Sequence, residues 1–95
     1  MDIDKAFGAV LRELREHRQI NQAGFGSAAS RNYIGLLEQG KHSPTLDKIG
    51  QIAEVLGVEP LVLILLAYDK AGEQEVGASG RAALNALKLL TVELG

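Results

Sequence analysis

Arginine and amide side chains stand together at the start of one short segment with helical spacing. Arg31 and Asn32 follow Ser30, whose side-chain oxygen can accept hydrogen bonds from the free N–H groups of a first helical turn. Ile34 and Leu37 share one side of this helix. The opposite side carries Arg31, Asn32, Gly35 and Leu36. Guanidinium and carboxamide groups pair with guanine and adenine edges, and Leu36 can touch a thymine methyl or pack on a neighbouring helix. This pattern indicates a helix that reads base pairs.

Residue types for other chemistry are missing or have simpler explanations. The chain has no cysteine and only two histidines, His17 and His42, without clustered acids around them, so we expect no metal site. The serines fit helix caps and turns, and no base or orienting acid stands at a catalytic spacing. There is no glycine-rich loop of the nucleotide-binding types. The sequence therefore predicts no catalytic residues, no metal and no cofactor, and a protein that is not an enzyme.

Apolar spacing elsewhere in the chain predicts an all-α scaffold that holds this helix. Residues recur at three- and four-residue steps, which is typical of helices with one buried side. Five helices are expected, starting near Asp2 or Asp4, Asn21, Ser30, Thr45 and Pro60. Gly40 and Gly57 are expected to end two of them, because glycine tolerates the positive φ found just past a helix end. These helices form the predicted domain, residues 1–68.

The C-terminal third differs in composition from this domain. Residues 69–80 are rich in glycine and charge, and we expect a flexible linker there. Residues 81–95 are expected to form a last helix with a short heptad seam. The helix after Pro60 is apolar on every side, and a small domain covers only one side of it. A homodimer interface is therefore predicted at Leu61, Ile64, Leu65, Tyr68, Leu84, Leu87, Leu90 and Leu94.

The chain resembles the phage repressor-type helix-turn-helix regulators (Cro/cI-like, XRE) over roughly residues 5–66. The resemblance rests on LRELR at 11–15, Asn21 and Gln22, SRNYI at 30–34, LEQGK at 37–41 and SPTLDKIGQIAEVLGV at 43–58. It implies a five-helix lambda-repressor-like domain in which the helix after Ser30 enters the major groove. Three features depart from the family pattern. Gln19 stands where the first helix usually ends in a small residue, the turn glycine is missing, and the link from Gln22 to Glu38 is shorter.

The resemblance also implies roles for residues outside the base-reading face. A structural ion pair is expected between Arg15 and Glu38, which would tie the first helix to the third. Contacts to DNA phosphates are expected from Gln22, Tyr33, Lys41, His42 and Ser43. Generic polar loop and helix positions are the alternative reading of these five residues.

Charge limits how this chain can bind DNA. Ten Lys/Arg and twelve Asp/Glu leave a formal net charge of −2. Non-specific affinity comes from neutralised phosphates, so binding to random DNA is expected to be weak and the placement of cations decisive. The N-terminus lacks the features of a signal peptide, and Leu61–Ala67 is too short to span a bilayer. We predict a cytoplasmic regulator that binds double-stranded DNA as a homodimer. The alternative is an antitoxin-like module whose apolar C-terminal part binds a partner protein.

Overall fold

Helices are the only regular elements of the chain, as the all-α prediction requires. The structure is a computed structural model that describes residues 1–95. The elements in chain order are α1 (Ile3–His17), the 3₁₀ turn η1 (Gly26–Ala28), α2 (Arg31–Glu38), α3 (Leu46–Leu56), α4 (Pro60–Ala71) and α5 (Ala78–Leu94). The chain bends by 103° between α3 and α4. No single helix is long and apolar enough to cross a membrane.

Side-chain caps and glycines set most of the helix ends where the sequence predicts them. The Asp2 carboxylate accepts hydrogen bonds from the first turn of α1. Ser30 and Thr45 do the same for α2 and α3, each accepting an N–H at 3.1 Å. Gly40 and Gly57 adopt φ values of +71° and +73° just past α2 and α3. These ends are local, so the residues next to them determine where each helix starts and stops.

The helix expected from Asn21 is not formed as an α-helix. The chain makes consecutive turns there, with the Gly24 N–H donating to the Asn21 carbonyl at 2.9 Å, and then the single 3₁₀ turn η1. Gly26 has φ +58°, which right-handed helices do not accommodate. Phe25 and Ala29 are still buried, so the segment keeps its apolar anchors without a regular helix.

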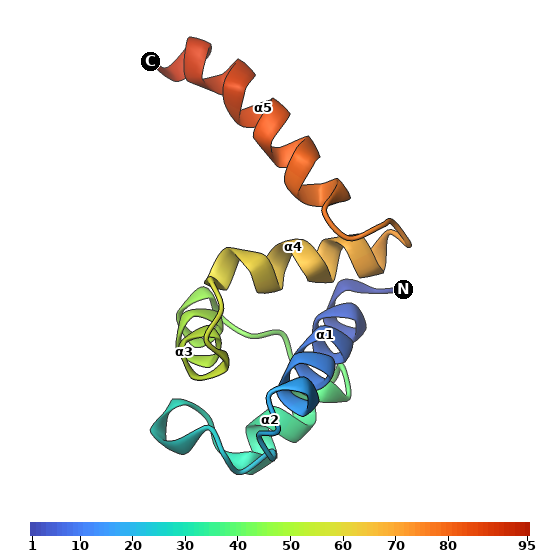
Figure 1. The fold of residues 1–95 in the computed structure, drawn as a ribbon, viewed down its shortest axis with the longest axis vertical. Helices are drawn as coiled ribbons and strands as arrows, with labels where there is room; N and C mark the ends of the chain where they lie inside the picture. Colours follow the sequence, from blue (N-terminus) through green and yellow to red (C-terminus); the bar gives the residue numbers. More distant parts are fainter.

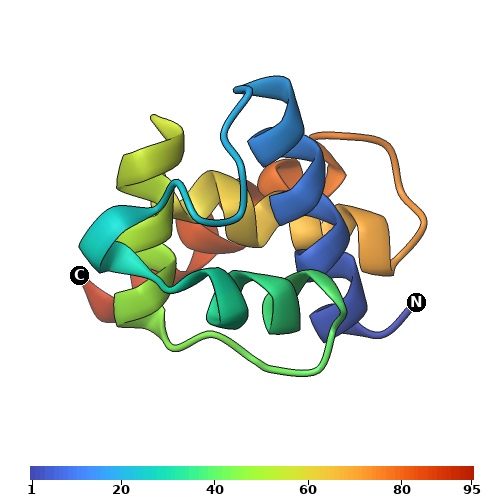
Figure 2. The same cartoon turned by 90° about the horizontal axis from the view of Figure 1, so that it is seen from below.

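One apolar core holds α1 to α4 together. Its thirteen buried members are Phe7, Val10, Leu11, Phe25, Ala29, Ile34, Leu37, Ile49, Ile52, Ala53, Leu56, Leu63 and Ala67. In Figure 1, α4 lies across α1 and α3, and α2 lies below them. Figure 2 shows α2 on the near face with α5 behind α4. α2 and α5 therefore lie on opposite sides of the domain.

A glycine lets α1 and α2 approach closely. A Cβ atom added to Gly8 would lie 2.2 Å from the Leu37 carbonyl oxygen and 2.9 Å from that of Glu38. Both atoms belong to the backbone and cannot move aside as a flexible side chain would. Only glycine fits at this position, and the position of α2 on the domain depends on it.

Helices occupy both ends of residues 69–80, where a flexible linker is expected. α4 continues through Ala71, three residues past the predicted end of the domain, and α5 begins at Ala78. The connection between them is therefore only residues 72–77. None of the residues of α5 is buried, and the helix projects away from α1–α4 in Figure 1.

Candidate nucleic-acid interface

The outer face of α2 forms a shallow hollow that gathers the predicted base-reading residues. The hollow has a volume of about 390 Å³ and is lined by Gln22, Arg31, Asn32, Gly35, Leu36 and Gln39. Arg31 and Asn32 are exposed, whereas Ile34 and Leu37 on the other side of α2 are fully buried. No atom lies within 4 Å of a Cβ built on Gly35, so this position opens directly to solvent. The face is polar, accessible and held by a buried opposite side.

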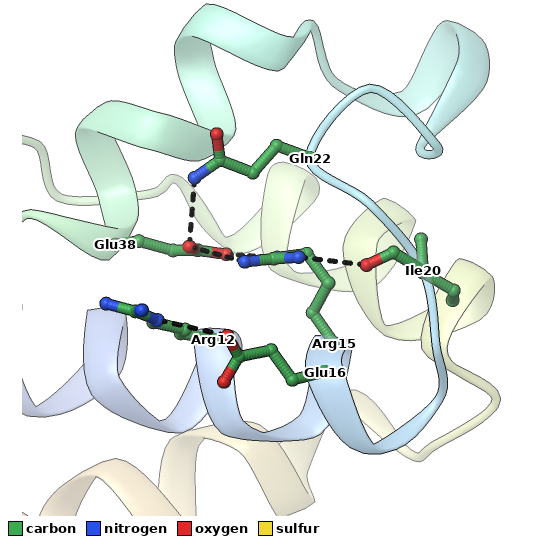
Figure 3. A network of polar contacts seen from close by, with 6 residues as sticks. All are labelled: Arg12, Arg15, Glu16, Ile20, Gln22 and Glu38. Atoms are coloured by element: carbon green, nitrogen blue, oxygen red, sulfur yellow. Dashed lines mark hydrogen bonds and ion pairs between the residues drawn. The ribbon is translucent and has the colours of Figure 1, made fainter.

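A polar network fixes the hollow to α1. Arg15 and Glu38 form a two-pronged pair, Nε to Oε2 at 2.6 Å and Nη2 to Oε1 at 3.0 Å, and their side chains are only 11% and 5% exposed. Arg15 also donates to the Ile20 carbonyl at 2.9 Å. The Gln22 amide donates to Glu38 Oε1 at 3.1 Å, as Figure 3 shows. The structure therefore brings the predicted pair together and adds Gln22 to it.

The pairing of Arg15 with Glu38 compensates the negative charge of α2. The hydrogen bond and the charge of Glu38 raise the pKa of Arg15 above its usual value, against the burial that lowers it. Glu38 is the only acid in α2, and its two oxygens are both engaged by Arg15. Its negative charge is thereby compensated and does not repel an approaching phosphate as a free carboxylate would. Gln22 keeps a second amide hydrogen for an outside acceptor.

Tyr33, His42 and Lys48 form a stack beside the hollow. The rings of Tyr33 and His42 lie 6.1 Å apart, and the Lys48 ammonium lies 5.7 Å from the Tyr33 centroid. Lys48 also donates to the Ala28 carbonyl at 2.6 Å, which ties α3 to η1. Tyr33 is therefore half-buried between two basic residues, and His42 folds back toward the first turn of α2.

Lys41 and Ser43 have different surroundings although they are two residues apart. Lys41 is exposed just past the end of α2 and makes no ion pair. The Ser43 hydroxyl donates to the Asp4 carboxylate at the start of α1. It faces a separate apolar hollow between α1, α3 and α4. A carboxylate repels phosphate, so Asp4 would oppose a phosphate contact at Ser43, which stays a prediction.

The helix-turn-helix domain family model matches residues 6–64, which is more than half of the chain. The chain belongs to the helix-turn-helix domain family. No match was found among curated proteins or among solved structures. The matched range runs from α1 into α4 and includes the whole hollow on α2. Domains of this type place their second helix in the major groove of DNA.

In this helix-turn-helix domain, the helix expected before α2 is replaced by turns and η1. The chain compensates with tertiary contacts. The Arg15 hydrogen bond to Ile20 and the Gln22 hydrogen bond to Glu38 hold the start of the segment. The Lys48 hydrogen bond to Ala28 holds its end. Each of these contacts starts from a side chain on a neighbouring element or ends on one. The segment is positioned without a regular helix.

Two residues of this surface are absent from the sequence prediction. Gln39 lines the hollow with Asn32, Gly35 and Leu36, and all four lie at three- and four-residue steps. Helical periodicity alone could have found it. Lys48 comes from α3, and no local pattern places its ammonium on the Tyr33 ring. Only the packing of α3 against η1 reveals this cation.

The predicted interface residues lie on α4 and α5, on the far side of the domain from α2. Leu61, Tyr68, Leu84, Leu87, Leu90 and Leu94 are exposed. Leu65 is half-buried. Ile64 is also half-buried, and both Ile64 and Leu66 pack against the core.

No group of three His, Cys, Asp or Glu side chains is placed to hold a metal ion.

Proposed function

We propose that this helix-turn-helix protein is a cytoplasmic transcriptional regulator of the phage repressor type that binds specific double-stranded DNA as a homodimer. The hollow on α2 carries the proposal. Its lining combines a guanidinium, three carboxamides, a glycine and a leucine, and it contains no free carboxylate. Guanidinium and carboxamide groups distinguish base pairs in the major groove, and a leucine side chain fits the thymine methyl.

The proposed docking places α2 along the floor of the major groove. Arg31 and Asn32 read base edges from the first turn of α2, and Gln39 extends this readout toward its other end. Gly35 lets the helix backbone approach the bases closely, because nothing projects there. Eight residues of α2 span roughly 12 Å, which suits a few base pairs at one half-site.

Cations and amides around the hollow supply the proposed phosphate contacts. Gln22 is oriented by Glu38 and offers its remaining N–H to one strand. Lys41 and His42 are exposed past the end of α2, and Tyr33 stands next to His42. Phosphate contacts set the register of the helix but carry no sequence information. The proposed division is therefore base reading by Arg31 and Asn32, and docking by the surrounding groups.

Selection of bound sequences from a random DNA pool tests base reading directly. The purified chain should enrich a defined sequence, and Arg31→Ala or Asn32→Ala should each weaken binding to it by about 1–3 kcal/mol while changing random-DNA binding little. Lys88→Ala, on α5 and far from α2, is the matched control and should bind as the parent does. No enrichment, or equal losses on selected and random DNA, would contradict base-specific recognition.

The exposed α5 supports a second candidate function, an antitoxin-like module that binds a partner protein. All residues from Arg81 to Leu94 are exposed, and most of them are apolar. A chain that stays monomeric when pure and associates only with a partner encoded beside it would favour this function over the homodimer.

A further inference from the structure

The Asp69 carboxylate holds the start of α5 against the end of α4. Asp69 is 3% exposed and is the only buried charged residue. Its Oδ2 accepts the Gly77 N–H at 2.9 Å, and its Oδ1 accepts the Ser79 N–H at 2.7 Å. Free N–H groups at a helix start attract a carboxylate, so a residue of α4 caps α5. The direction in which α5 leaves the domain is therefore fixed, although the domain does not cover it.

α4 and α5 turn apolar sides toward each other across the angle between them. Leu65 lies next to Gly80, since a Cβ on Gly80 would lie 3.6 Å from the Leu65 side chain. Helical steps from these two positions identify the remaining residues on the same sides. We call this surface the wedge: Leu61, Val62, Leu65 and Tyr68 on α4, and Ala83, Leu84, Leu87 and Leu94 on α5.

The wedge is open on the side away from the core. Leu63 and Ala67 lie on the opposite side of α4 and are buried in the core. Leu61, Tyr68 and Leu87 of the wedge are 59%, 57% and 59% exposed. In Figure 1, α5 diverges from α4 on the side opposite α1, so no other element of the chain reaches between them.

The exposed surface area of the chain exceeds that of a compact monomer by about the area that one partner buries in an interface. Its accessible area is 6231 Å², whereas a compact monomer of 10.1 kDa exposes about 5,300 Å². The excess, about 900 Å², is close to the ~800 Å² that each partner contributes to a standard interface. The radius of gyration, 14.3 Å, likewise exceeds the roughly 12.4 Å expected for this length.

We propose that two copies of this chain dimerise by placing α5 of each copy in the wedge of the other. This inference rests on the homodimer of the proposed function and names its interface. The wedge requires an apolar helix, and α5 is such a helix, with Lys88 as its only charge between Arg81 and Glu93. A two-fold exchange covers the apolar stripes of α4 and α5 in both chains at once and leaves no unpaired copy of the interface.

Asp69 acts in this interface as a positioning residue. The exchange requires α5 to stand away from its own α4 at a set angle, because an arm folded back would fill its own wedge. The two hydrogen bonds that Asp69 accepts hold that angle before the partner arrives. An arm that is already ordered loses less conformational freedom on association, which strengthens the dimer without any contact from Asp69 to the partner.

Sedimentation equilibrium without DNA tests the proposed interface. Leu87→Asp on α5 and Leu61→Asp on α4 should each weaken dimerisation by about 30-fold or more, as at a buried interface centre. Leu89→Asp is the matched control, because Leu89 is 72% exposed on the outer side of the same helix. It should change the dimer dissociation constant less than about threefold, as rim positions do. Circular dichroism should show unchanged helix content in all three variants.

Mixed-chain crosslinking gives an independent readout, since the natural chain has no cysteine. A Leu61→Cys chain mixed with a Leu87→Cys chain should form a disulfide between chains, and a Leu89→Cys chain in place of the second should not. A monomeric parent chain, a dimer insensitive to Leu61 and Leu87, or α5 covered only by a different protein would overturn the proposal. Because no DNA is present, failure of the DNA-binding proposal would not affect these results.

Discussion

Gln19 occupies a backbone position that favours glycine. It follows α1 with φ +59°, in the left-handed region, and its side chain is exposed. A residue with a Cβ atom in this region costs about 1–2 kcal/mol relative to ordinary helical backbone, and glycine avoids most of this cost. The departure of this chain from the family pattern at Gln19 is thus a local strain that the fold tolerates.

We therefore expect Gln19→Gly to raise the free energy of unfolding by about 0.5–1 kcal/mol, measured by urea denaturation. Gln39→Gly is the control, because Gln39 follows α2 with φ −83° and gains nothing from glycine. Equal effects of the two substitutions would show that the φ value of Gln19 does not limit stability.

A substitution at Gly35 should change protein stability and DNA affinity in opposite directions. It lies inside α2 with no atom near its absent Cβ, so Gly35→Ala should stabilise the free protein by about 0.8–1 kcal/mol in thermal or urea unfolding. The added methyl group projects into the hollow, so the affinity for the selected DNA should fall. Gly50→Ala in α3 is the matched control, because its Cβ also meets nothing. It should stabilise similarly and leave DNA affinity unchanged. A Gly35→Ala chain with full affinity would argue against close approach of α2 to the bases.

At the scale of elements, the order of α5 depends on one carboxylate of α4. Hydrogen bonds from the Ser79 side chain and from the Gly77 and Ser79 N–H groups hold the pKa of Asp69 below its ordinary value of 3.8. Because the pKa of Asp69 is lowered in the folded chain, the ionised carboxylate stabilises the fold above pH 3.8. This stabilisation is lost as the pH falls through the folded-state pKa.

The amide signals of Gly77 and Ser79 should therefore stay constant from neutral pH to about pH 4 and change only below the ordinary carboxyl pKa. Asp69→Asn should lower their hydrogen-exchange protection at every pH above the pKa of Asp69, because the charge is gone, whereas amide protection in α1 should remain. A midpoint above pH 3.8 at these two amides would contradict the role of the ionised carboxylate.

Across the whole molecule, net charge and local charge have opposite consequences for DNA binding. The chain carries a formal charge of −2, yet α2 contains one acid, which Arg15 neutralises, and Lys41 and His42 follow it. Binding should thus be specific rather than generally electrostatic, with a shallow dependence on salt.

Lys41→Ala should reduce the slope of log affinity against log salt by about 0.9 per protomer on the selected sequence, because one phosphate contact is lost. The melting temperature should not change, since Lys41 makes no ion pair. Lys88→Ala on α5 is the control and should leave the slope as it is. An unchanged slope for Lys41→Ala would place Lys41 away from the DNA backbone.

The sequence by itself determined the features that depend on neighbours along the chain. The caps Ser30 and Thr45, the end glycines Gly40 and Gly57, and the buried side of α2 all follow from contacts over three or four residues. The pairing of Arg15 with Glu38 came from family resemblance, because the two residues stand 23 positions apart. The α-helix predicted from Asn21 was wrong because Gly24 and Gly26 favour turns, while buried Phe25 and Ala29 supply anchors that need no regular helix.

Tertiary structure alone decided where polar side chains find their partners. Gln22 meets Glu38 across 16 residues, and Lys48 reaches Ala28 across 20, because α1 to α3 fold around one core. Glycine and charge in residues 69–80 indicate a flexible linker by composition. Burial of Asp69 beside the α5 amides instead fixes that helix, since a carboxylate out of water must find donors. Composition indicates how a segment behaves when it is exposed to water. Only the fold shows which of its side chains are buried.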